Sequence, residues 1–380
     1  MPVPPPAPPP SGLPPFLEES AAELGLEVRA ILPAGRLPDE VLERHQAWLD
    51  AGFAGEMDYL QSQAPAAADL RAWKPWAGAA VLFALPYARA AGSFRGGGRV
   101  ARYALGQDYH HRLGRQLQRL GRRLRKAGEI ARFRACVDAA PVLEREWALR
   151  GNLGFRGKNT LILDPALGPW LLLGELLVDV EWPTWAPPAP SPTCGSCTRC
   201  LDACPTGAFP APYQLDARKC ISYLTIELQG RIPIELRSAM ADWVFGCDVC
   251  LEVCPFGSEA ADQGASWGRL AALDALRLED LLALTEAEFE AAFRGSPLRR
   301  PGWAGLLRNA CVALGNLGHG GAALATALHH PAPVVRGHAA WALGRLGERG
   351  PLETARGNET DPLAKDEIEA ALASFGNSRA

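Results

Sequence analysis

Lysine is scarce in this chain of 380 residues: it occurs only at positions 74, 126, 158, 219 and 365, and arginine supplies the remaining positive charge. The sequence also has no run of about 18 uncharged apolar residues, so it predicts no membrane span. The first residues, MPVPPPAPPPSGLPP, include neither a charged leader nor an apolar stretch, which argues against a secretory signal and predicts a proline-rich tail over residues 1–15. We therefore expect a cytoplasmic protein, in which disulfides are disfavoured.

The composition predicts a folded protein of several domains. Hydrophobic residues make up 48% of the chain and charged residues 21%, which supports a sizeable core and excludes general disorder. The formal net charge is −3. Any contact with a nucleic acid would therefore depend on local basic patches rather than on overall charge.

The ten cysteines are the clearest chemical signal in the sequence. Cys136 and Cys311 stand alone in apolar surroundings and are predicted to be buried. The others fall between residues 194 and 254, in two runs of ferredoxin type with one cysteine between them. The first run is Cys194-x2-Cys197-x2-Cys200-x3-Cys204-Pro205, the second is Cys247-x2-Cys250-x3-Cys254-Pro255, and Cys220 lies between the two.

This spacing predicts two [4Fe–4S] clusters with exchanged ligands. Three thiolates at two-residue gaps surround one cluster, whereas the cysteine just before proline reaches the other. The first cluster would be held by Cys194, Cys197, Cys200 and Cys254, and the second by Cys204, Cys220, Cys247 and Cys250. Cys220 is included because Val244 occupies the position of the remaining ligand in a simple two-cluster ferredoxin. The alternatives are a disulfide framework and structural zinc, although zinc favours paired CxxC units with longer gaps.

Residues 16–182 alternate between helical and strand-like patterns, which predicts an α/β or α+β domain. We expect helices over residues 16–62, strands at 79–88, 130–138 and 170–180, and an amphipathic helix at 108–127. One side of that last helix carries Leu113, Leu117, Leu120 and Leu124, and the other carries Arg112, Arg115, Arg119, Arg122 and Arg123. The arginine side is either a phosphate-contacting face or an ordinary solvated surface.

The proline-rich residues 182–193 mark a boundary. We predict a cluster domain over residues 183–260, with a helical insertion at 218–230, and a helical domain over 261–380. In the helical domain RNACVALGNLG (308–318) recurs as RGHAAWALGRLG (336–347), which predicts a short HEAT-like array. Its concave face would carry Arg308, Arg336 and Arg345 and would meet either RNA or the rest of the protein.

Six stretches of the chain also match a known family. They are GQDYHHRL (106–113), VDAAPVLER (137–145), GNLGFRGKNT (151–160), CGSCTRCLDACPTGA (194–208), CISYLTIE (220–227) and GCDVCLEVCP (246–255). Together with the helical repeat, they resemble the epoxyqueuosine reductase family over residues 16–376. The resemblance implies a multidomain α+β protein with an α/β cobalamin-binding catalytic domain at 16–182, followed by the ferredoxin-like and HEAT-like domains.

The resemblance also implies an activity. The chain would be an oxidoreductase that reduces the epoxide of epoxyqueuosine, at the wobble position of certain tRNAs, to queuosine. It would use base-off cobalamin, fed with electrons by the two [4Fe–4S] clusters. The implied partners are that tRNA and a low-potential electron donor, with no membrane, and the implied state is a monomer.

Particular residues acquire roles through the resemblance. Asp138 would be the proton donor, with its pKa raised in a dry pocket; without the resemblance it is better explained as a helix N-cap before Pro141. Asp108 and Tyr109 would contact the substrate base. The implied cobalamin contacts are Arg71, Lys158, Ser222, Thr225 and Asp248, each otherwise an ordinary surface or capping residue. The stretch from Asp108 to Gly114 is one residue too long for the DxHxxG pattern, which argues against a histidine-ligated cobalt.

Two other functions are compatible with paired clusters. A reductive dehalogenase would share the cobalamin and cluster logic, but such proteins carry export signals and typically have no helical repeat. A plain electron carrier that docks partners through its repeat would leave the N-terminal domain and Asp138 without a role.

Overall fold

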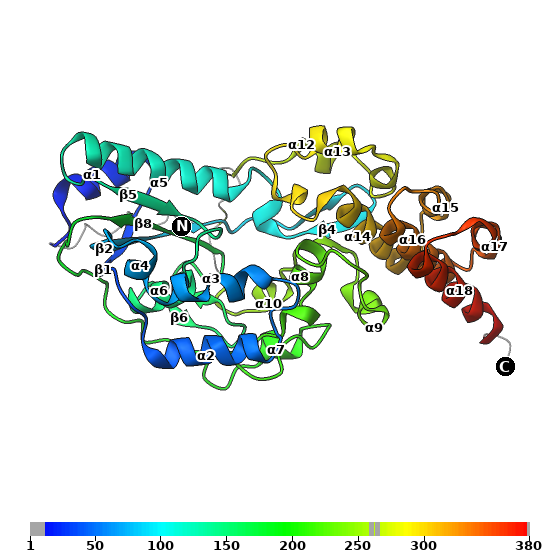
Figure 1. Cartoon of the computed structure of the whole chain (residues 1–380), viewed down its shortest axis with the longest axis horizontal. Helices are drawn as coiled ribbons and strands as arrows, with labels where there is room; N and C mark the ends of the chain where they lie inside the picture. The colour runs from blue at the N-terminus through cyan, green and yellow to red at the C-terminus, as the bar shows by residue number, and fades with distance from the viewer. Residues whose placement is uncertain (1–11, 258–261, 263–266, 378–380) are drawn as a thin grey trace.

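The computed structural model describes residues 12–257, 262 and 267–377, so most of the predicted proline-rich tail lies outside the described residues. The molecule is elongated (Figure 1), with a sheet and its helices at one end, the cysteine-bearing segment in the middle and the C-terminal helices at the other end. Within the described residues, no helix combines the length and the apolar character needed to cross a bilayer.

The N-terminal part is built on a four-stranded sheet in the order β1-β2-β8-β5, in which every neighbouring pair is antiparallel. The strands are β1 (Val28–Pro33), β2 (Ala79–Pro86), β5 (Phe133–Cys136) and β8 (Leu171–Val178). The α/β class predicted for this domain is therefore wrong, and the α+β alternative applies. Alternating helices and strands in a sequence do not specify strand direction, which here depends on how each connection returns.

Helices cover both faces of this sheet. On one face α1 (Pro15–Glu23) and α5 (Tyr109–Lys126) pack against alternate residues of the strands, and the predicted leucine stripe of α5 is fully buried. On the other face lie residues of α2 (Asp39–Asp50), α4 (Leu70–Trp73) and α6 (Glu144–Arg150). The helix α3 (Asp58–Ala68) lies between α2 and α4 along the chain.

The prediction of helix throughout residues 16–62 is wrong at β1. That strand begins at Val28, and its short apolar run is too brief to distinguish from a helical pattern by periodicity alone. It is decided by pairing with β2, in which Ile31 lies opposite Val81.

A second, smaller sheet joins distant parts of the chain. The glycine-rich residues form the hairpin β3 (Gly92–Phe94) and β4 (Gly97–Val100), and β4 pairs in parallel with β9 (Trp243–Phe245), just before Cys247. A two-stranded unit of β6 (Phe155–Arg156) and β7 (Ile162–Leu163) follows α6.

The cysteine-bearing segment consists of short helices. They are α7 (Arg199–Asp202), α8 (Ile221–Ile226), α9 (Ile234–Arg237) and α10 (Val249–Glu252), with 3-10 turns at Ala217–Lys219 and Ser238–Met240; a further 3-10 turn at Arg102–Ala104 precedes α5. The predicted helical insertion at 218–230 is thus confirmed by α8. Short helices allow the chain to turn often enough to bring cysteines from separate runs together.

The C-terminal part is helical, as predicted. Its helices are α12 (Ala271–Ala275), α13 (Glu286–Ala292), α14 (Gly302–Leu317), α15 (Gly321–Ala327), α16 (Pro333–Leu346), α17 (Arg349–Asn358) and α18 (Pro362–Asn377), with 3-10 turns at Glu279–Ala283 and Pro297–Arg299. The two repeated segments end α14 and α16 in the same way, at Gly318 and Gly347 in the left-handed conformation.

One hydrophobic core runs from Phe94 through the cysteine-bearing segment to Ala371 at the C-terminal end. The sequence predicts Arg308 on a face that would meet either RNA or the rest of the protein; it lies inside this core and is fully buried, so for this residue the second alternative applies. Its guanidinium donates to the carbonyl oxygens of Leu224, Leu228 and Gly230, at 2.7–2.8 Å. This residue therefore packs the helical part onto the cysteine-bearing segment.

Candidate functional site

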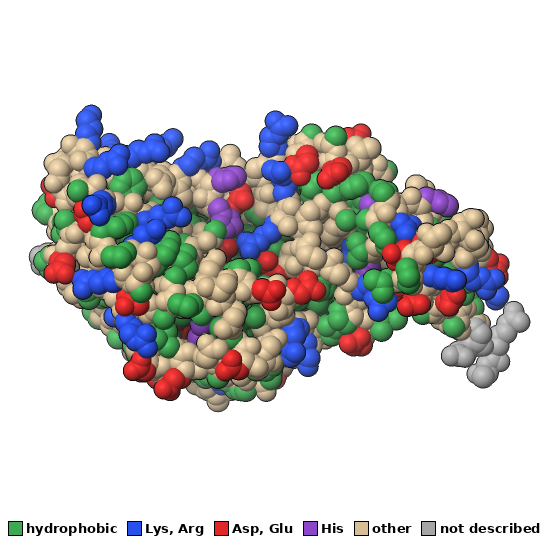
Figure 2. Space-filling model, in the orientation of Figure 1, with side chains coloured by type: hydrophobic (Ala, Val, Ile, Leu, Met, Phe, Trp, Pro, Cys, Tyr) green, Lys and Arg blue, Asp and Glu red, His purple; other side chains and the backbone are tan. Residues whose placement is uncertain are grey.

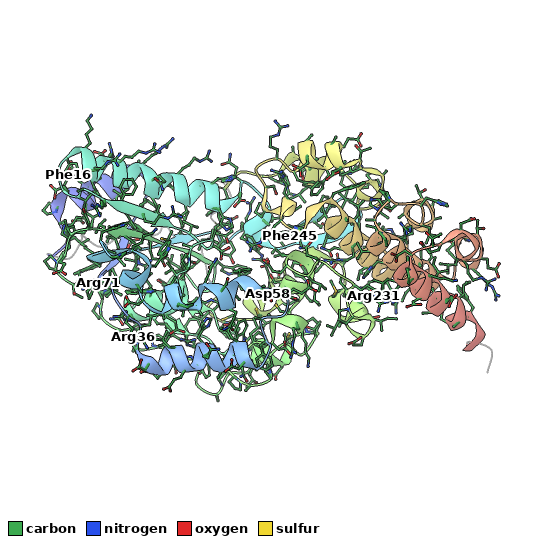
Figure 3. All side chains as sticks on the ribbon, in the orientation of Figure 1. Phe16, Arg36, Asp58, Arg71, Arg231 and Phe245 are labelled. Carbon is green, nitrogen blue, oxygen red and sulfur yellow. The ribbon has the colours of Figure 1, made fainter. Side chains whose placement is uncertain are left out.

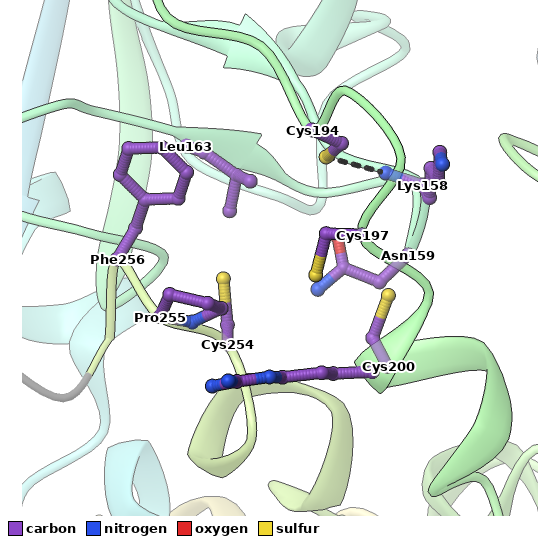
Figure 4. Close-up of a pocket in the computed structure, with 10 residues that line it drawn as sticks. Lys158, Asn159, Leu163, Cys194, Cys197, Cys200, Cys254, Pro255 and Phe256 are labelled. Atoms are coloured by element: carbon purple, nitrogen blue, oxygen red, sulfur yellow. Dashed lines mark hydrogen bonds between the residues drawn. The ribbon is translucent and has the colours of Figure 1, made fainter.

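The first set of cysteines converges on one pocket (Figure 4). Cys194, Cys197 and Cys200 line it together with Cys254 of the second run, as the spacing predicts. The backbone N–H of Lys158 donates to the sulfur of Cys194 over 3.4 Å. Such donors are typical around cluster sulfurs, where they stabilise the reduced state.

The second set is formed by Cys204, Cys220, Cys247 and Cys250. Burial raises the pKa of the Cys247 thiol, and the charges of Cys220 and Cys204 raise it further. Burial likewise raises the pKa of Cys250, with further contributions from Cys220 and Cys247. The charges of Cys204 and Cys220 thus act on thiols of the second run, which supports the predicted grouping of these four cysteines. Cys136 and Cys311 are buried elsewhere, as predicted.

Among the described residues, no group of three His, Cys, Asp or Glu side chains is placed to hold a single metal ion. The convergence of Cys254 with the first run is the exchange of ligands expected of paired iron–sulfur clusters.

Thr225 and Asp248 support the second set rather than reaching into a pocket. The Thr225 side chain is fully buried; its hydroxyl donates to the carbonyl of Ile221 and accepts from the N–H of Gly246, next to Cys247. Asp248 is also buried and accepts from the backbone N–H of Arg102 over 2.7 Å. These side chains therefore fix the loop that carries Cys247, which differs from the cofactor contact predicted for them.

Asp138 lies at the centre of a polar network. Its Oδ2 accepts a hydrogen bond from the Tyr109 hydroxyl at 2.9 Å, lies 3.0 Å from Nε2 of His110 and lies 3.4 Å from the guanidinium of Arg300. The φ angle of Asp138 is +54°, in the left-handed region that non-glycine residues rarely adopt. The alternative role as a helix N-cap is wrong, because α6 begins at Glu144 and its N-cap is Leu143.

The raised pKa predicted for Asp138 is wrong. Burial opposes ionisation of this carboxyl, but the hydrogen bonds from His110 and Tyr109 and the charge of Arg300 outweigh burial and lower its pKa to about 2. Conversely, burial disfavours the His110 cation, but Asp108 and Asp138 on its two sides raise its pKa to about 9. At neutral pH the proton of this pair therefore resides on His110.

Asp108 positions His110. It is the N-cap of α5, and its Oδ1 accepts from the backbone N–H of His110 at 2.9 Å and lies 2.7 Å from the ring Nδ1. Tyr109 stacks on the same imidazole, with ring centroids 4.1 Å apart. The two predicted substrate contacts are thus adjacent to Asp138.

Tyr109 separates two pockets. One of them holds Asp138, Glu144 and Arg145 against the apolar side chains of Leu161, Ile162, Pro169, Leu171, Leu172 and Leu173. The other, of about 350 Å³, is lined by Tyr103, Asp108, His110, His111, Phe245, Gly295, Ser296, Pro297, Arg299 and Arg300. Figure 2 shows histidines in a hollow between basic side chains of α5 and those beside α12 and α13.

The remaining predicted contacts lie apart from Asp138. Lys158 lines the first cysteine pocket, and its Nζ donates to the carbonyl of Gly195 over 2.8 Å. The carbonyl of Ser222 accepts from the Thr225 hydroxyl. Arg71 donates to Glu181 and to the carbonyl of Ala77, and Figure 3 places it beside the sheet, far from Phe245.

Three charged residues of the site carried no prediction of their own. His110 stands inside the family stretch GQDYHHRL, where its position two residues after Asp108 is the available signal. Glu144 likewise stands inside VDAAPVLER. Arg300, which also pairs with Glu227 at 2.9 Å, lies 162 residues from Asp138 in sequence and has no local signal.

Comparison with known proteins identifies the family. Residues 68–139 match the family described as "Epoxyqueuosine reductase QueG, DUF1730", and residues 193–257 match the "4Fe-4S double cluster binding domain". Epoxyqueuosine reductase of Pseudomonas aeruginosa is 40% identical over 355 residues, which cover 90% of this chain and 96% of the relative. The chain belongs to the epoxyqueuosine reductase family.

Further epoxyqueuosine reductases are also similar to this chain in sequence or structure. The Escherichia coli enzyme is 39% identical over 315 residues, covering 80% of this chain and 82% of its own. A crystal structure of epoxyqueuosine reductase with a tRNA-Tyr epoxyqueuosine-modified stem loop matches with a TM-score of 0.83 and 30% identity, covering 95% of this chain and 98% of that one. The Bacillus subtilis enzyme matches with a TM-score of 0.80 and 29% identity, covering 94% and 97%. As a family member, this chain is an oxidoreductase that binds two [4Fe–4S] clusters.

Proposed function

We propose that this chain removes the epoxide oxygen of epoxyqueuosine in tRNA, yielding queuosine, with Asp138 and His110 delivering a proton to the departing oxygen. The observation that carries the proposal is the position of Asp138 in one pocket, 3.0 Å from the His110 imidazole that lines the other pocket, with Tyr109 lining both. Removal of the oxygen as water consumes two electrons and two protons and leaves a carbon–carbon double bond.

The electrons would pass through the two cysteine sets. We propose that Cys194, Cys197, Cys200 and Cys254 hold one [4Fe–4S] cluster and that Cys204, Cys220, Cys247 and Cys250 hold the other. Burial raises the pKa of the Cys220 thiol, and the charge of Arg145, which lines the pocket of Asp138, opposes that rise; we expect this set to pass electrons to the reacting site. A low-potential donor would supply the electrons one at a time.

The pocket of Asp138 is the proposed cobalamin site. Its leucine and isoleucine wall suits the apolar face of a corrin ring, and the guanidinium of Arg145 suits an amide or phosphate oxygen. Bound there, cobalamin would bring a reducible cobalt to the substrate. Asp108 and Asp138 engage the two ring nitrogens of His110, which reserves this side chain for holding a proton.

The chain's own groups have distinct tasks in this scheme. Burial and the charge of Asp138 raise the pKa of Tyr109, so its phenol stays protonated and keeps donating to Asp138. The imidazolium of His110 holds the transferable proton, and the Asp138 carboxylate presents it to the pocket. In the Bacillus subtilis enzyme, an aspartate-bearing catalytic loop has been seen swung out of the active site, which supports a mobile role for the equivalent loop.

We expect the tRNA substrate to approach along the basic side chains of α5 and those beside α12 and α13. The related crystal structure that contains an epoxyqueuosine-modified tRNA stem loop supports a tRNA substrate. The larger pocket offers the edges and rings that an extruded base requires: Asp108 and His111 provide polar groups, and Tyr103 and Phe245 provide aromatic faces.

The test is a nucleoside analysis by mass spectrometry. Epoxyqueuosine-bearing tRNA is incubated with the reduced, cobalamin-loaded protein, beside Asp138→Asn and the control Glu27→Gln, whose side chain is 73% exposed. Queuosine should form with the wild type and the control, and at least about 100-fold more slowly with Asp138→Asn, as expected for loss of a general acid. Failure of the wild type to form queuosine, with clusters and corrinoid verified, would overturn the proposal.

A further inference from the structure

The proposed reaction consumes two protons, and the Asp138–His110 pair accounts for one. A second acid group, partly buried, stands on the other side of Asp138. Oε1 of Glu144 accepts a hydrogen bond from the backbone N–H of Asp138 at 2.5 Å, and Glu144 lines the same pocket. Its carboxyl group can therefore carry a proton toward the pocket.

Glu175 lies behind Glu144 in the middle of the sheet. It belongs to β8, opposite Leu82 of β2 and Cys136 of β5. Because side chains alternate along a strand, Glu175 shares the face of Leu177, which packs toward α6 and therefore toward Glu144. The residue is 2% exposed, and its Oε2 has no hydrogen-bond partner among the described residues.

A carboxylate is poorly stabilised at this position. A buried charge without a partner is costly, so a carboxyl group there takes up a proton instead. The charged and titratable groups that face Glu144 come from four elements and the loop after β5: Asp138, Cys136, Glu175, Tyr109, His110 and Arg145.

Taken together, the surrounding groups favour the protonated, neutral form of Glu144. Burial and the negative charge of Asp138 raise the pKa of Glu144, and together they outweigh the Asp138 N–H, Arg145 and His110. Burial raises the pKa of Glu175 as well, and the charge of Glu144 adds to it. Two carboxyl groups so close in an apolar layer cannot both be ionised.

We propose that Glu144 is the second proton donor of the reaction. Glu175 is its neutral neighbour, since burial and the charge of Glu144 raise the pKa of Glu175. This inference rests on the proposed function. Both carbon–oxygen bonds of the epoxide break and the oxygen leaves as water. Two electrons arrive from the reduced clusters, one proton comes through Asp138 from His110 and the other from Glu144. Glu144 then takes up a proton from solvent between turnovers.

The variant Glu144→Gln removes the proton donor but keeps the hydrogen bond that Glu144 accepts from the loop. The amide oxygen of glutamine can still accept from the Asp138 N–H, whereas its nitrogen cannot supply a proton to the reaction. With the cluster- and cobalamin-loaded protein, conversion of epoxyqueuosine-bearing tRNA should slow by about 100-fold at unchanged KM. Glu175→Gln, which replaces a neutral acid by a neutral amide, should leave the rate and its alkaline limb near those of the wild type, because Glu175 donates no proton to the reaction.

A second measurement does not depend on turnover. A carboxyl whose folded pKa is raised contributes stability that is fully present below its ordinary value of about 4.5 and is lost as the pH rises through the raised value. The unfolding temperature of the loaded wild type should therefore fall over that pH range. It should fall less steeply for Glu144→Gln and Glu175→Gln, whereas Glu27→Gln should follow the wild type.

The outcomes separate the two proposals. If the wild type forms no queuosine, the proposed function fails, whatever the variants do. If the wild type is active while Glu144→Gln matches its rate, or if the unfolding curves of the two glutamine variants follow the wild type at every pH, the proposal for Glu144 and Glu175 is overturned and the proposed function stands.

Discussion

At the scale of single residues, the site depends on where one proton resides. Asp138 is the group that faces the pocket, yet it is held as a carboxylate by three donors. His110 is the group that carries the proton, because two carboxylates flank its ring. The acid is thus a pair, in which one member contacts the pocket and the other stores the charge.

The pair predicts a pH profile. His110 and Glu144 must both be protonated, so kcat of the wild type should fall in two steps as the pH rises, through about 8 for Glu144 and about 9 for His110. His110→Gln should lower kcat by about 100-fold and remove the step near 9. To isolate that step, the rate of queuosine formation is measured against pH in Glu144→Gln with and without His110→Gln, and His329→Gln, at an exposed position, is the control. A decline near pH 9 that persists in the double variant would contradict the assignment.

At the scale of elements, the helices α14 and α5 do more than fill the core. The helix α14 carries Arg308 and Asn309 into the core, where Asn309 donates to the carbonyls of Thr225 and Val244. Together they bind the carbonyls at the end of α8 and of β9, the elements beside Cys220 and Cys247. The C-terminal part is therefore integral to the second cluster site.

Arg308→Met should destabilise that site. It would leave the carbonyls of Leu224, Leu228 and Gly230 buried without their donor, a loss on the order of 3 kcal/mol. The urea midpoints for cluster absorbance and for helical circular dichroism should both decrease. Arg349→Met, at a side chain 60% exposed, is the control. Equal midpoints for the two variants would show that Arg308 does not stabilise this interface.

The helix α5 presents the alternatives that its sequence leaves open. Its leucines are buried and its outer arginines are exposed, which suits either a solvated surface or a tRNA contact. Replacing Arg115, Arg119 and Arg122 by alanine should weaken binding of the tRNA stem loop. It should also reduce the slope of log K against log salt by about 2. Binding with an unchanged slope would establish a merely solvated face.

At the scale of the whole molecule, the cysteine runs exchange ligands across the fold. Cys254 lies with Cys194 and Cys197, although it follows Cys250 in sequence. Cys254→Ser should therefore remove the cluster bound by the first run, and Cys220→Ser should remove the other. Each should lose about half of the iron.

The assay for this exchange is iron content with electron paramagnetic resonance of the reduced protein. The buried, remote Cys311→Ser is the control and should keep both signals. Loss of the same signal from Cys254→Ser and Cys220→Ser would contradict the assignment of separate sets.

The cysteine spacing, the leucine stripe of α5 and the helical C-terminal part were determined by the sequence alone, because each is a local pattern that the chain imposes on itself. Strand direction, the burial of Arg308 and the ionisation of Asp138 were decided only by the tertiary structure. The pKa of Asp138 depends on Arg300, 162 residues away, and that of Glu175 depends on Glu144 in another layer. Charge interactions act through space, so no local pattern of residues could have revealed them.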